Sequence, residues 1–336
     1  FCLNKLDKTF FSKNSFNNKY GVPLSIFNTP ETAKFSVLEV GMDKKGEIDH
    51  LTKLIRPNLG LITNISYAHI KNFDNLDNIA KAKAEIIDNI VCNGTMVINM
   101  DDKYHKYFLK KSKDRGLKIR TFSKVNQNAD IVFLSRRKYK KDYIVSVKFK
   151  KKIKSFVISK YLSNHIENIL ASISIISVYY DIEKLNRNLF SGFCIPISRG
   201  SLIDFKKGSK KLTLIDESYN SNPLSLKFAL ERYDYLYKKN NKKFLLIGNM
   251  LELGKYSKRL HIKIAKYINN SKINKAYVYG DQTKHTFNKL KPQIRGKVLK
   301  NKMDIYKLIK NDLPNNSFLM VKGSNSTGLN KIIQNL

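Results

Sequence analysis

Short apolar runs that alternate with helical patterns constrain this chain more than any other feature. The runs FSVLEVGM (35–42), LGLITNI (59–65) and GTMVINMDD (94–102) are too short to be helices, and helical patterns separate them. This βαβαβ order predicts a doubly wound parallel sheet of the α/β class. From about residue 119 to 158, short alternating strands predict a β-rich extension, and a helix over 166–180 returns the chain to the sheet.

A second α/β pattern follows in the carboxy-terminal half. Four strand-and-turn segments occur there, namely LTLIDESYNSNP, KKFLLIGNMLELG, KAYVYG and SFLMVKGS. They predict a Rossmann-like domain with its own core, and 336 residues with 42% hydrophobic content can bury two cores. We place the boundary at residue 197, giving domains 1–197 and 198–336. The opening stretch, FCLNKLDKTFF, predicts a helix.

The net charge of +36 does not by itself indicate a nucleic-acid partner. Lysines are spread over almost every segment, and the densest run, 136–154, alternates with apolar residues as solvent-facing strands do. Cys2, Cys92 and Cys194 form no CxxC pair, which argues against a disulfide framework or zinc knuckle. No apolar run reaches the roughly 18 residues of a membrane span, and no signal peptide is evident. The sequence predicts a cytoplasmic protein.

Two charged residues lie where apolar residues are expected. Lys83 falls within the apolar stripe of its predicted helix, so two interpretations stay open. In the first interpretation, the Lys83 ammonium reaches solvent past its neighbours. In the second, its amine has a lowered pKa or a chemical modification and lies beside a metal or phosphate. Glu39 lies near the carboxyl end of a predicted buried strand, where open α/β sheets bind ligands. That position favours a role in a metal or phosphate site.

Seven motifs occur in order along the chain, namely NNKYGVP, LEVGMDKKGEI, TNISYAHI, IAKAKAEI, DESYNSNPLS, GNMLELG with a later His261, and VKGS. Together they resemble the Mur ligase family. The forms GMxxxGEI, YNxNPxS and GxMxELG are similar to the branch that adds D-alanyl-D-alanine to UDP-N-acetylmuramoyl-tripeptide in peptidoglycan synthesis. The alternatives are a folylpolyglutamate synthase or cyanophycin synthetase-like member of the same superfamily, or a non-enzymatic basic nucleic-acid-binding protein.

The resemblance implies an ATP-dependent amide ligase with an acyl-phosphate intermediate and Mg²⁺ ions that screen charge between carboxylate and phosphate. We expect the chain to be a monomer. It implies that Glu39, His69 and Lys83 form the catalytic, metal-binding set, with Lys83 carbamylated. Asn168, Arg199 and Glu217 match nucleotide-binding positions. The positions that match substrate contacts are Asn17, Asn18, Asn64, Asn220, Asn222, Lys322, Gly323 and Ser324.

Departures from the family pattern affect the nucleotide site. The family has an amino-terminal domain that binds the UDP portion and then a phosphate loop, whereas no GxxxxGK[ST] motif occurs in these 336 residues. We therefore expect a truncated central domain and no ligation by this chain on its own. In LSNHIEN, aligned with the adenine motif GxHNxxN, only Asn168 matches. Asn249 and Asn325 replace the usual aspartate and arginine, changes that we expect the fold to tolerate.

Overall fold

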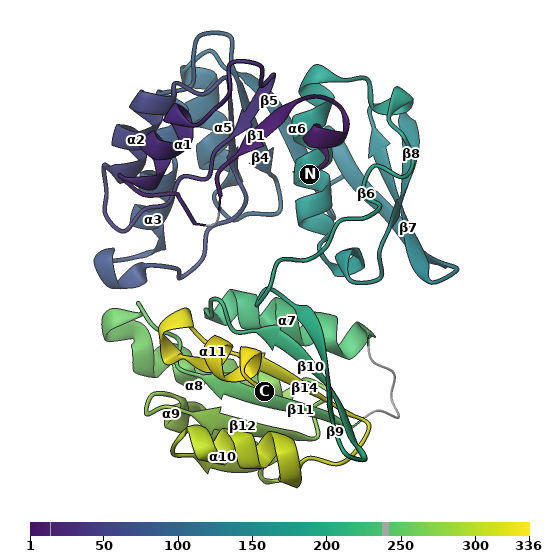
Figure 1. The fold of residues 1–336 in the computed structure, drawn as a ribbon. Coiled ribbons are helices and arrows are strands. Elements are labelled where there is room, and N and C mark those ends of the chain that lie inside the picture. The colour runs from purple at the N-terminus through teal and green to yellow at the C-terminus, as the bar shows by residue number, and fades with distance from the viewer. Residues whose placement is uncertain (14, 237–241) are drawn as a thin grey trace. The chain divides into compact units, whose positions relative to one another are not determined.

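The chain folds into two compact units, each built around its own sheet (Figure 1). The structure is a computed structural model that describes residues 1–13, 15–236 and 242–336. One unit comprises Phe1–Ile65 and Phe73–Phe193, and the other comprises Ser66–Asn72 and Cys194–Leu336. The α/β class predicted for both halves is confirmed. A domain boundary at residue 197 stays a prediction, and the short segment 66–72 packs with the second unit.

The first unit has a mainly parallel sheet with an antiparallel extension. The strands of the whole unit are β1 (Thr9–Phe11), β2 (Phe35–Val37), β3 (Leu59–Ile62), β4 (Thr95–Asn99), β5 (Lys118–Ser123), β6 (Ile131–Tyr139), β7 (Asp142–Phe149) and β8 (Lys152–Ile158). The main sheet comprises β3 to β8. Its helices are α1 (Gly21–Phe27), α2 (Glu47–Ile55), α3 (Leu76–Lys83), α4 (Glu85–Asp88), α5 (His105–Asp114) and α6 (Ile166–Tyr179). Strands β3 to β6 pair in parallel, and β6, β7 and β8 pair antiparallel in chain order.

Helix α6 covers the sheet where the parallel part meets the extension (Figure 1). Its buried Ile169 and Ile173 share one core with Phe122 of β5 and with Val145 and Phe156 of the extension. The strands of this region alternate buried and less buried residues, because only one side of the extension faces the helix.

The predicted helix at the amino terminus is wrong. Only Leu3–Lys5 form a turn of 3₁₀ helix, and Thr9–Phe11 instead form β1, which pairs in parallel with β2. Pairing with a strand more than twenty residues away overrides the local helical spacing of the apolar residues, as tertiary context often does. The two strands form a sheet of their own, outside the six-stranded sheet, and no residue of β2 is buried. The prediction that residues 35–42 form a buried strand of the doubly wound sheet is therefore wrong.

The second unit has a six-stranded sheet in the order β13-β12-β11-β14-β10-β9, parallel except for the β9–β10 hairpin. Its strands are β9 (Ser201–Lys207), β10 (Lys210–Glu217), β11 (Lys243–Gly248), β12 (Lys275–Tyr279), β13 (Arg295–Leu299) and β14 (Ser317–Lys322). Its helices are α7 (Pro223–Leu236), α8 (Ser257–Asn269), α9 (Thr283–Phe287), α10 (Lys302–Lys307) and α11 (Leu329–Gln334).

Both faces of this sheet are covered, as its nearly continuous apolar strands require. On one face, Leu246 and Val321 join a core that includes Ile305 of α10 and Leu329 of α11. On the other face, Tyr233 of α7 donates a hydrogen bond from its hydroxyl to the carbonyl of Phe318, at 2.9 Å. Among the residues that the structure describes, no helix has both the length and the apolar character needed to cross a membrane.

Candidate active site

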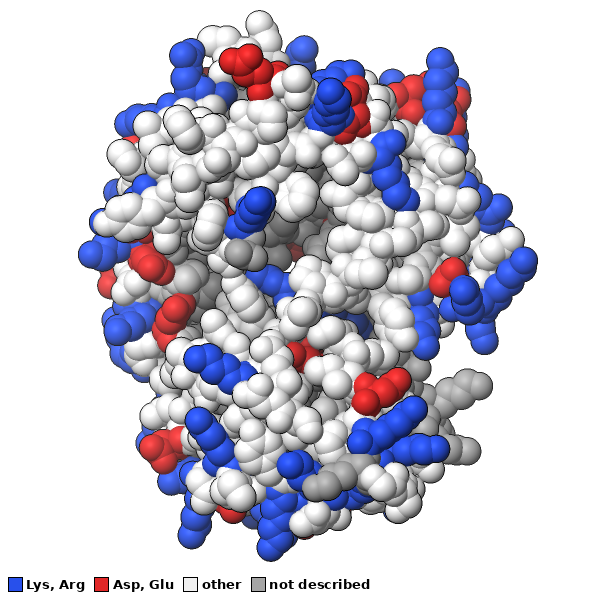
Figure 2. Space-filling model, in the orientation of Figure 1, with Lys and Arg blue, Asp and Glu red and all other residues white. Residues whose placement is uncertain are grey.

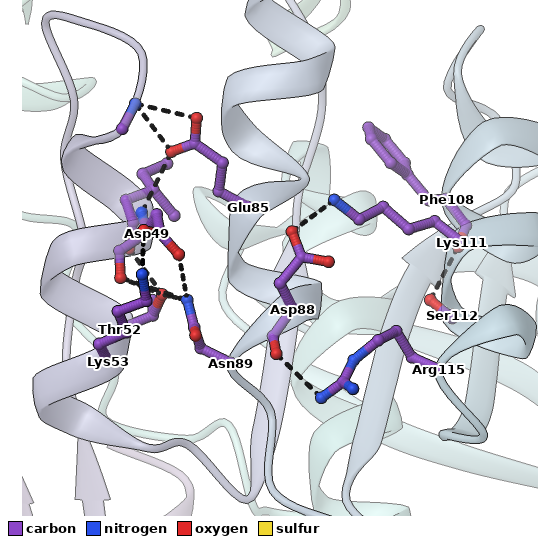
Figure 3. A network of polar contacts seen from close by, with 12 residues as sticks. Asp49, Thr52, Lys53, Glu85, Asp88, Asn89, Phe108, Lys111, Ser112 and Arg115 are labelled. Carbon is purple, nitrogen blue, oxygen red and sulfur yellow. Dashed lines mark hydrogen bonds and ion pairs between the residues drawn. The ribbon is translucent and has the colours of Figure 1, made fainter.

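A polar network fixes the turn that carries Lys83. Helix α3 ends at Lys83, and α4 begins at Glu85. The Glu85 carboxylate accepts backbone N–H groups of Gly46 at 2.9 Å and of Asp49 at 3.1 Å, so it caps the start of α2 (Figure 3). Asn89 donates its side-chain N–H to the Asp49 carboxylate at 2.9 Å. Capping by a carboxylate is favourable at a helix N-terminus, and here it ties α2 and α4 together.

Lys83 and Glu39 interact electrostatically within the first unit. The Lys83 side chain is largely buried, which lowers the pKa of its amine, and attraction to Glu39 acts in the opposite direction. The residue as a whole is intermediate in exposure, so the lowered pKa agrees with the second interpretation of Lys83 while both interpretations stay open. A lower pKa enlarges the fraction of neutral amine, and the neutral amine is the form that reacts with carbon dioxide.

Asn17 holds Glu39 in place. Glu39 follows the end of β2, and its Oε1 accepts a hydrogen bond from Asn17 Nδ2 at 2.9 Å. The carbonyl of Asn17 accepts the N–H of Gly41 at 2.7 Å. A Cβ atom at Gly41 would lie 3.0 Å from Asn17 Cγ, so this close approach suits glycine. Two residues that the sequence assigned to different roles, metal binding and substrate binding, are thus adjacent.

His69 lies in the second compact unit, whereas Glu39 and Lys83 lie in the first. Its Nδ1 is 2.8 Å from Oε2 of Glu252, and the N–H of Lys71 donates to the Glu252 carbonyl at 2.9 Å. His69 and Glu252 both adopt left-handed backbone conformations, with φ of 59° and 61°. This pairing with Glu252 was not anticipated from the sequence, because nothing in the spacing links residue 69 to residue 252.

The remaining predicted positions of the first unit are exposed or used locally. Asn18 Oδ1 accepts the N–H groups of Tyr20 and Gly21, at 3.0 and 2.9 Å, and so caps α1. Asn64 is exposed in the coil after β3, and Asn168 is exposed on α6. Their contacts with substrate and nucleotide stay predictions.

A buried charge cluster lies at the carboxyl ends of two adjacent strands of the second unit. Glu217 ends β10 and is the register partner of Lys322, which ends β14. Oε2 of Glu217 is 3.5 Å from Lys322 Nζ, and Oε1 forms an ion pair with Arg232 of α7. Lys322 Nζ also donates to the Asn220 carbonyl at 3.0 Å. Sequence reasoning missed Arg232, because α7 carries several charged residues and none is marked by spacing as the partner of Glu217.

Arg199 adds a further positive charge to this cluster. Its guanidinium lies 4.2 Å from the ring centroid of Tyr219, a cation–π contact. Burial, together with Arg232 and Arg199, lowers the pKa of Lys322 to about 7, although the Glu217 carboxylate lies 3.5 Å from its Nζ. Burial dominates because the side chain is only 2% exposed.

This lowered pKa predicts that stability rises with pH. Between about pH 7 and 10.5 the unfolded chain keeps a proton that folded Lys322 has lost. From pH 7 to pH 9 the free energy of unfolding should therefore rise more in the unsubstituted protein than in Lys322→Met, by up to about 2–3 kcal/mol. Urea unfolding at both pH values measures this difference, and Lys211→Met, at an exposed lysine of β10, is the control. Parallel pH profiles for the protein and Lys322→Met would contradict the shift.

Most of the other predicted residues of the second unit make contacts within or next to the loops that follow β10 and β14. Asn222 Oδ1 accepts the N–H of Ser225 at 2.9 Å and caps α7. Ser324 Oγ accepts the N–H of Leu251 at 2.9 Å, so the loop after β14 is joined to the loop after β11. Gly323 fits between them, because a Cβ atom there would lie 2.8 Å from Leu329 Cδ1 and 3.3 Å from the Cα of Gly248.

A pocket of about 430 Å³ opens beside these loops, at the carboxyl ends of the strands. Sequence reasoning did not identify it. Its polar lining includes Asn249, Asp281, Lys284, Lys300 and Thr327. Asp281 Oδ1 pairs with Lys284 Nζ at 2.9 Å. The pocket therefore presents one carboxylate and two ammonium groups, which suits a small ligand that carries both signs of charge.

Positive charge does not gather into one patch on the face drawn in Figure 2. Lysine and arginine are spread over this face, with acidic residues between them. Several lysines also form ion pairs, such as Lys152 with Glu183 at 2.5 Å. This distribution gives no support to the nucleic-acid alternative, which needs a clustered basic surface.

Comparisons with known proteins agree with this arrangement. Residues 3–176 match the Mur ligase middle domain, and residues 203–325 match the Mur ligase glutamate ligase domain. UDP-N-acetylmuramoyl-tripeptide–D-alanyl-D-alanine ligase of Rickettsia prowazekii is 29% identical over 328 residues, covering 96% of this chain and 71% of the relative. The ligase of the same name from Buchnera aphidicola (subspecies Baizongia pistaciae) is 30% identical over 344 residues, covering 99% and 70%.

Two solved structures share the fold. MurF from Acinetobacter baumannii has a TM-score of 0.86 at 20% identity, covering all of this chain and 72% of that chain. MurF ligase from Thermotoga maritima, in complex with ADP, has a TM-score of 0.81 at 21% identity, covering 99% and 74%.

Proposed function

Because this chain belongs to the Mur ligase family, we propose that it is the ATP-dependent ligase that joins D-alanyl-D-alanine to UDP-N-acetylmuramoyl-tripeptide. The observation that carries the proposal is the identity of 29–30%, over nearly the whole chain, to relatives of that name. We further propose that the reaction takes place in the cytoplasm, where ATP is available, and that the chain acts as a monomer.

The donor set of the first unit fits a magnesium ion. Mg²⁺ takes oxygen ligands and is usually bound by one or two carboxylates together with substrate phosphates. Glu39 is an exposed carboxylate held by Asn17, and carbamylation would convert the amine of Lys83 into an oxygen-bearing anion. Among the described residues, no three His, Cys, Asp or Glu side chains are grouped as a metal site. We assign Glu39 and carbamylated Lys83 as its oxygen ligands, and His69, a nitrogen donor of the second unit, as a further ligand on the resemblance alone.

The bound ion would screen the repulsion between the substrate carboxylate and the γ-phosphate. A tripeptide carboxylate oxygen attacks the γ-phosphorus, ADP leaves, and an acyl phosphate forms. The amine of D-alanyl-D-alanine then attacks the acyl carbon, loses a proton, and displaces phosphate. The residues that we assign to the nucleotide are Asn168, Arg199 and Glu217. Arg199 supplies a guanidinium that already contacts the Tyr219 ring, so its planar fork of N–H donors is ordered before a phosphate binds.

We place D-alanyl-D-alanine in the pocket beside the loop after β14. The dipeptide is a zwitterion, and the pocket offers Asp281 for its ammonium group and Lys284 or Lys300 for its carboxylate. Lys322, Gly323 and Ser324 lie just before Ser326 and Thr327, which line the same pocket. The loop 322–324, predicted to contact the dipeptide, is thus joined to a pocket whose lining residues are known.

The ligation test uses a loop-completed protein, meaning this chain fused behind the part of the Rickettsia relative that precedes the matched region, which is expected to hold the UDP-binding domain and the phosphate loop. We expect the amide product only when UDP-muramoyl-tripeptide, D-alanyl-D-alanine and ATP are all present, detected by mass spectrometry. The 336-residue chain alone should turn over ATP no faster than its Glu39→Ala variant, because it has no phosphate loop. A folded fusion that forms no product, alongside an active Rickettsia enzyme, would contradict the proposal.

A further inference from the structure

A buried histidine holds the backbone that lines the dipeptide pocket. His261 lies on α8 and is fully buried. Its Nε2 is 3.1 Å from the backbone nitrogen of Met250, and its Nδ1 is 2.8 Å from the carbonyl oxygen of Ser257. A backbone N–H can only donate and a carbonyl can only accept. The imidazole must therefore be neutral, with its proton on Nδ1 and its lone pair on Nε2.

The residue held by His261 lies between two residues of the pocket wall. Met250 is itself buried, while Asn249 and Leu251 both line the pocket. Ser324 holds the same short stretch from the other side, because its N–H donates to the Asn249 carbonyl at 3.2 Å and its Oγ accepts the N–H of Leu251 at 2.9 Å. The three backbone positions are thus fixed by one histidine and one serine.

Asn249 is also tightly packed in the pocket wall, so it cannot move without changing the shape of the pocket. Asn249 Oδ1 accepts the N–H of Thr283 at 3.3 Å, and a Cβ atom at Gly280 would lie 2.6 Å from that oxygen. A change in the position of Met250 therefore alters the place of the Asn249 amide inside the pocket. Burial lowers the pKa of His261, which keeps Nε2 free of a proton and able to accept.

We propose that His261 is a positioning residue of the dipeptide site, which shapes the pocket through the hydrogen bond that its Nε2 accepts from Met250. The inference rests on the proposed function, since it takes the pocket as the site of D-alanyl-D-alanine. His261 itself touches no substrate. Its effect should appear in the affinity for the dipeptide and leave the nucleotide site unchanged.

Two amide variants separate the two nitrogens of the ring. The side-chain amide of glutamine reaches the position of Nε2, so His261→Gln can still accept from Met250. Asparagine reaches only the position of Nδ1, so His261→Asn keeps a donor for the Ser257 carbonyl and loses the acceptor. His261→Leu loses both. Thermal unfolding of each variant shows which of them fold.

The measurement is the dissociation constant for D-alanyl-D-alanine, by NMR titration of the 336-residue chain. We expect His261→Gln to bind within about twofold of the unsubstituted chain, and His261→Asn to bind about tenfold more weakly. Asp281→Asn tests the pocket directly and should also weaken binding. In the loop-completed protein, His261→Asn should raise KM for the dipeptide and leave KM for ATP unchanged.

The outcomes distinguish this inference from the pocket assignment. If Asp281→Asn weakens binding but folded His261→Asn binds as tightly as the unsubstituted chain, the positioning role is wrong and the pocket stands. If His261→Gln is as weak as His261→Asn, the acceptor at Nε2 is not what matters, and the inference fails. If the unsubstituted chain binds no dipeptide, or Asp281→Asn changes nothing, the pocket assignment fails and the inference with it.

Discussion

Replacement of Lys83 by alanine in the loop-completed protein should lower the rate of ligation by about 10²–10³-fold or more, with little change in thermal stability. The loss is large because a carbamate at this position would face the metal ion, and removing one preorganised electrostatic contact from an active site typically costs about 10²–10³-fold in rate. Stability should hold, because burying this amine is itself unfavourable, and this cost offsets the attraction to Glu39 that the substitution removes. Product formation and thermal unfolding measure the two effects.

Bicarbonate provides a second measurement of the same site. Added bicarbonate should raise the activity of the unsubstituted protein and leave that of Lys83→Ala unchanged, because only the lysine amine can form the carbamate. Lys81→Ala is the matched control, since Lys81 is an exposed residue of the same helix and should behave as the unsubstituted protein. Full activity in Lys83→Ala would return this lysine to the interpretation in which its ammonium simply reaches solvent.

Replacement of Glu217 by alanine should destabilise the second unit by about 3–5 kcal/mol, because it leaves two buried cations without their counter-charge. The side chains of Arg232 and Lys322 are only 15% and 2% exposed, and both pair with this carboxylate. The loss should be larger at pH 6 than at pH 9, since Lys322 needs no counter-charge once it is neutral. Scanning calorimetry at both pH values tests this.

The control for Glu217 is Glu231, an exposed carboxylate next to Arg232 in the sequence. Glu231 of α7 is 59% exposed and lies 3.7 Å from Lys227, so Glu231→Ala should change the free energy of unfolding by less than about 1 kcal/mol. If Glu217→Ala is no more damaging than Glu231→Ala, the cluster does not stabilise the unit in the way the geometry indicates. The measurement needs no ligation, so it is independent of any contact between Glu217 and nucleotide.

Sequence periodicity predicted the α/β class well, because it depends on the alternation of buried strands and amphipathic helices along the chain. It failed at the amino terminus, where Thr9–Phe11 pair with Phe35–Val37 and the partner strand is remote in sequence. It also predicted one continuous helix through Lys83, whereas the structure has a break at Ala84. Local patterns carry no information on a partner that arrives later in the chain.

The candidate site was predictable only in part, for a similar reason. Motifs pointed to Glu39 and Lys83, and the structure places these two within electrostatic reach of each other. They could not reveal that Arg232 pairs with Glu217, that Glu252 pairs with His69, or that Asp281 and Lys284 line a pocket. Each of these depends on which side chains the fold brings together across different elements. The metal, nucleotide and substrate roles of the predicted residues stay predictions.

The placement of segment 66–72 has a consequence for synthesis on the ribosome. Both flanking stretches belong to the first unit, yet this segment packs with residues near Glu252. At about 5–20 residues per second, roughly 10–40 s pass between translation of residue 69 and of residue 252. The strands and helices around the segment can form during that time, but its own contacts must wait. A nascent chain therefore holds this loop exposed to proteases and chaperones until late in translation, and cutting the gene between the two units would leave it without a partner.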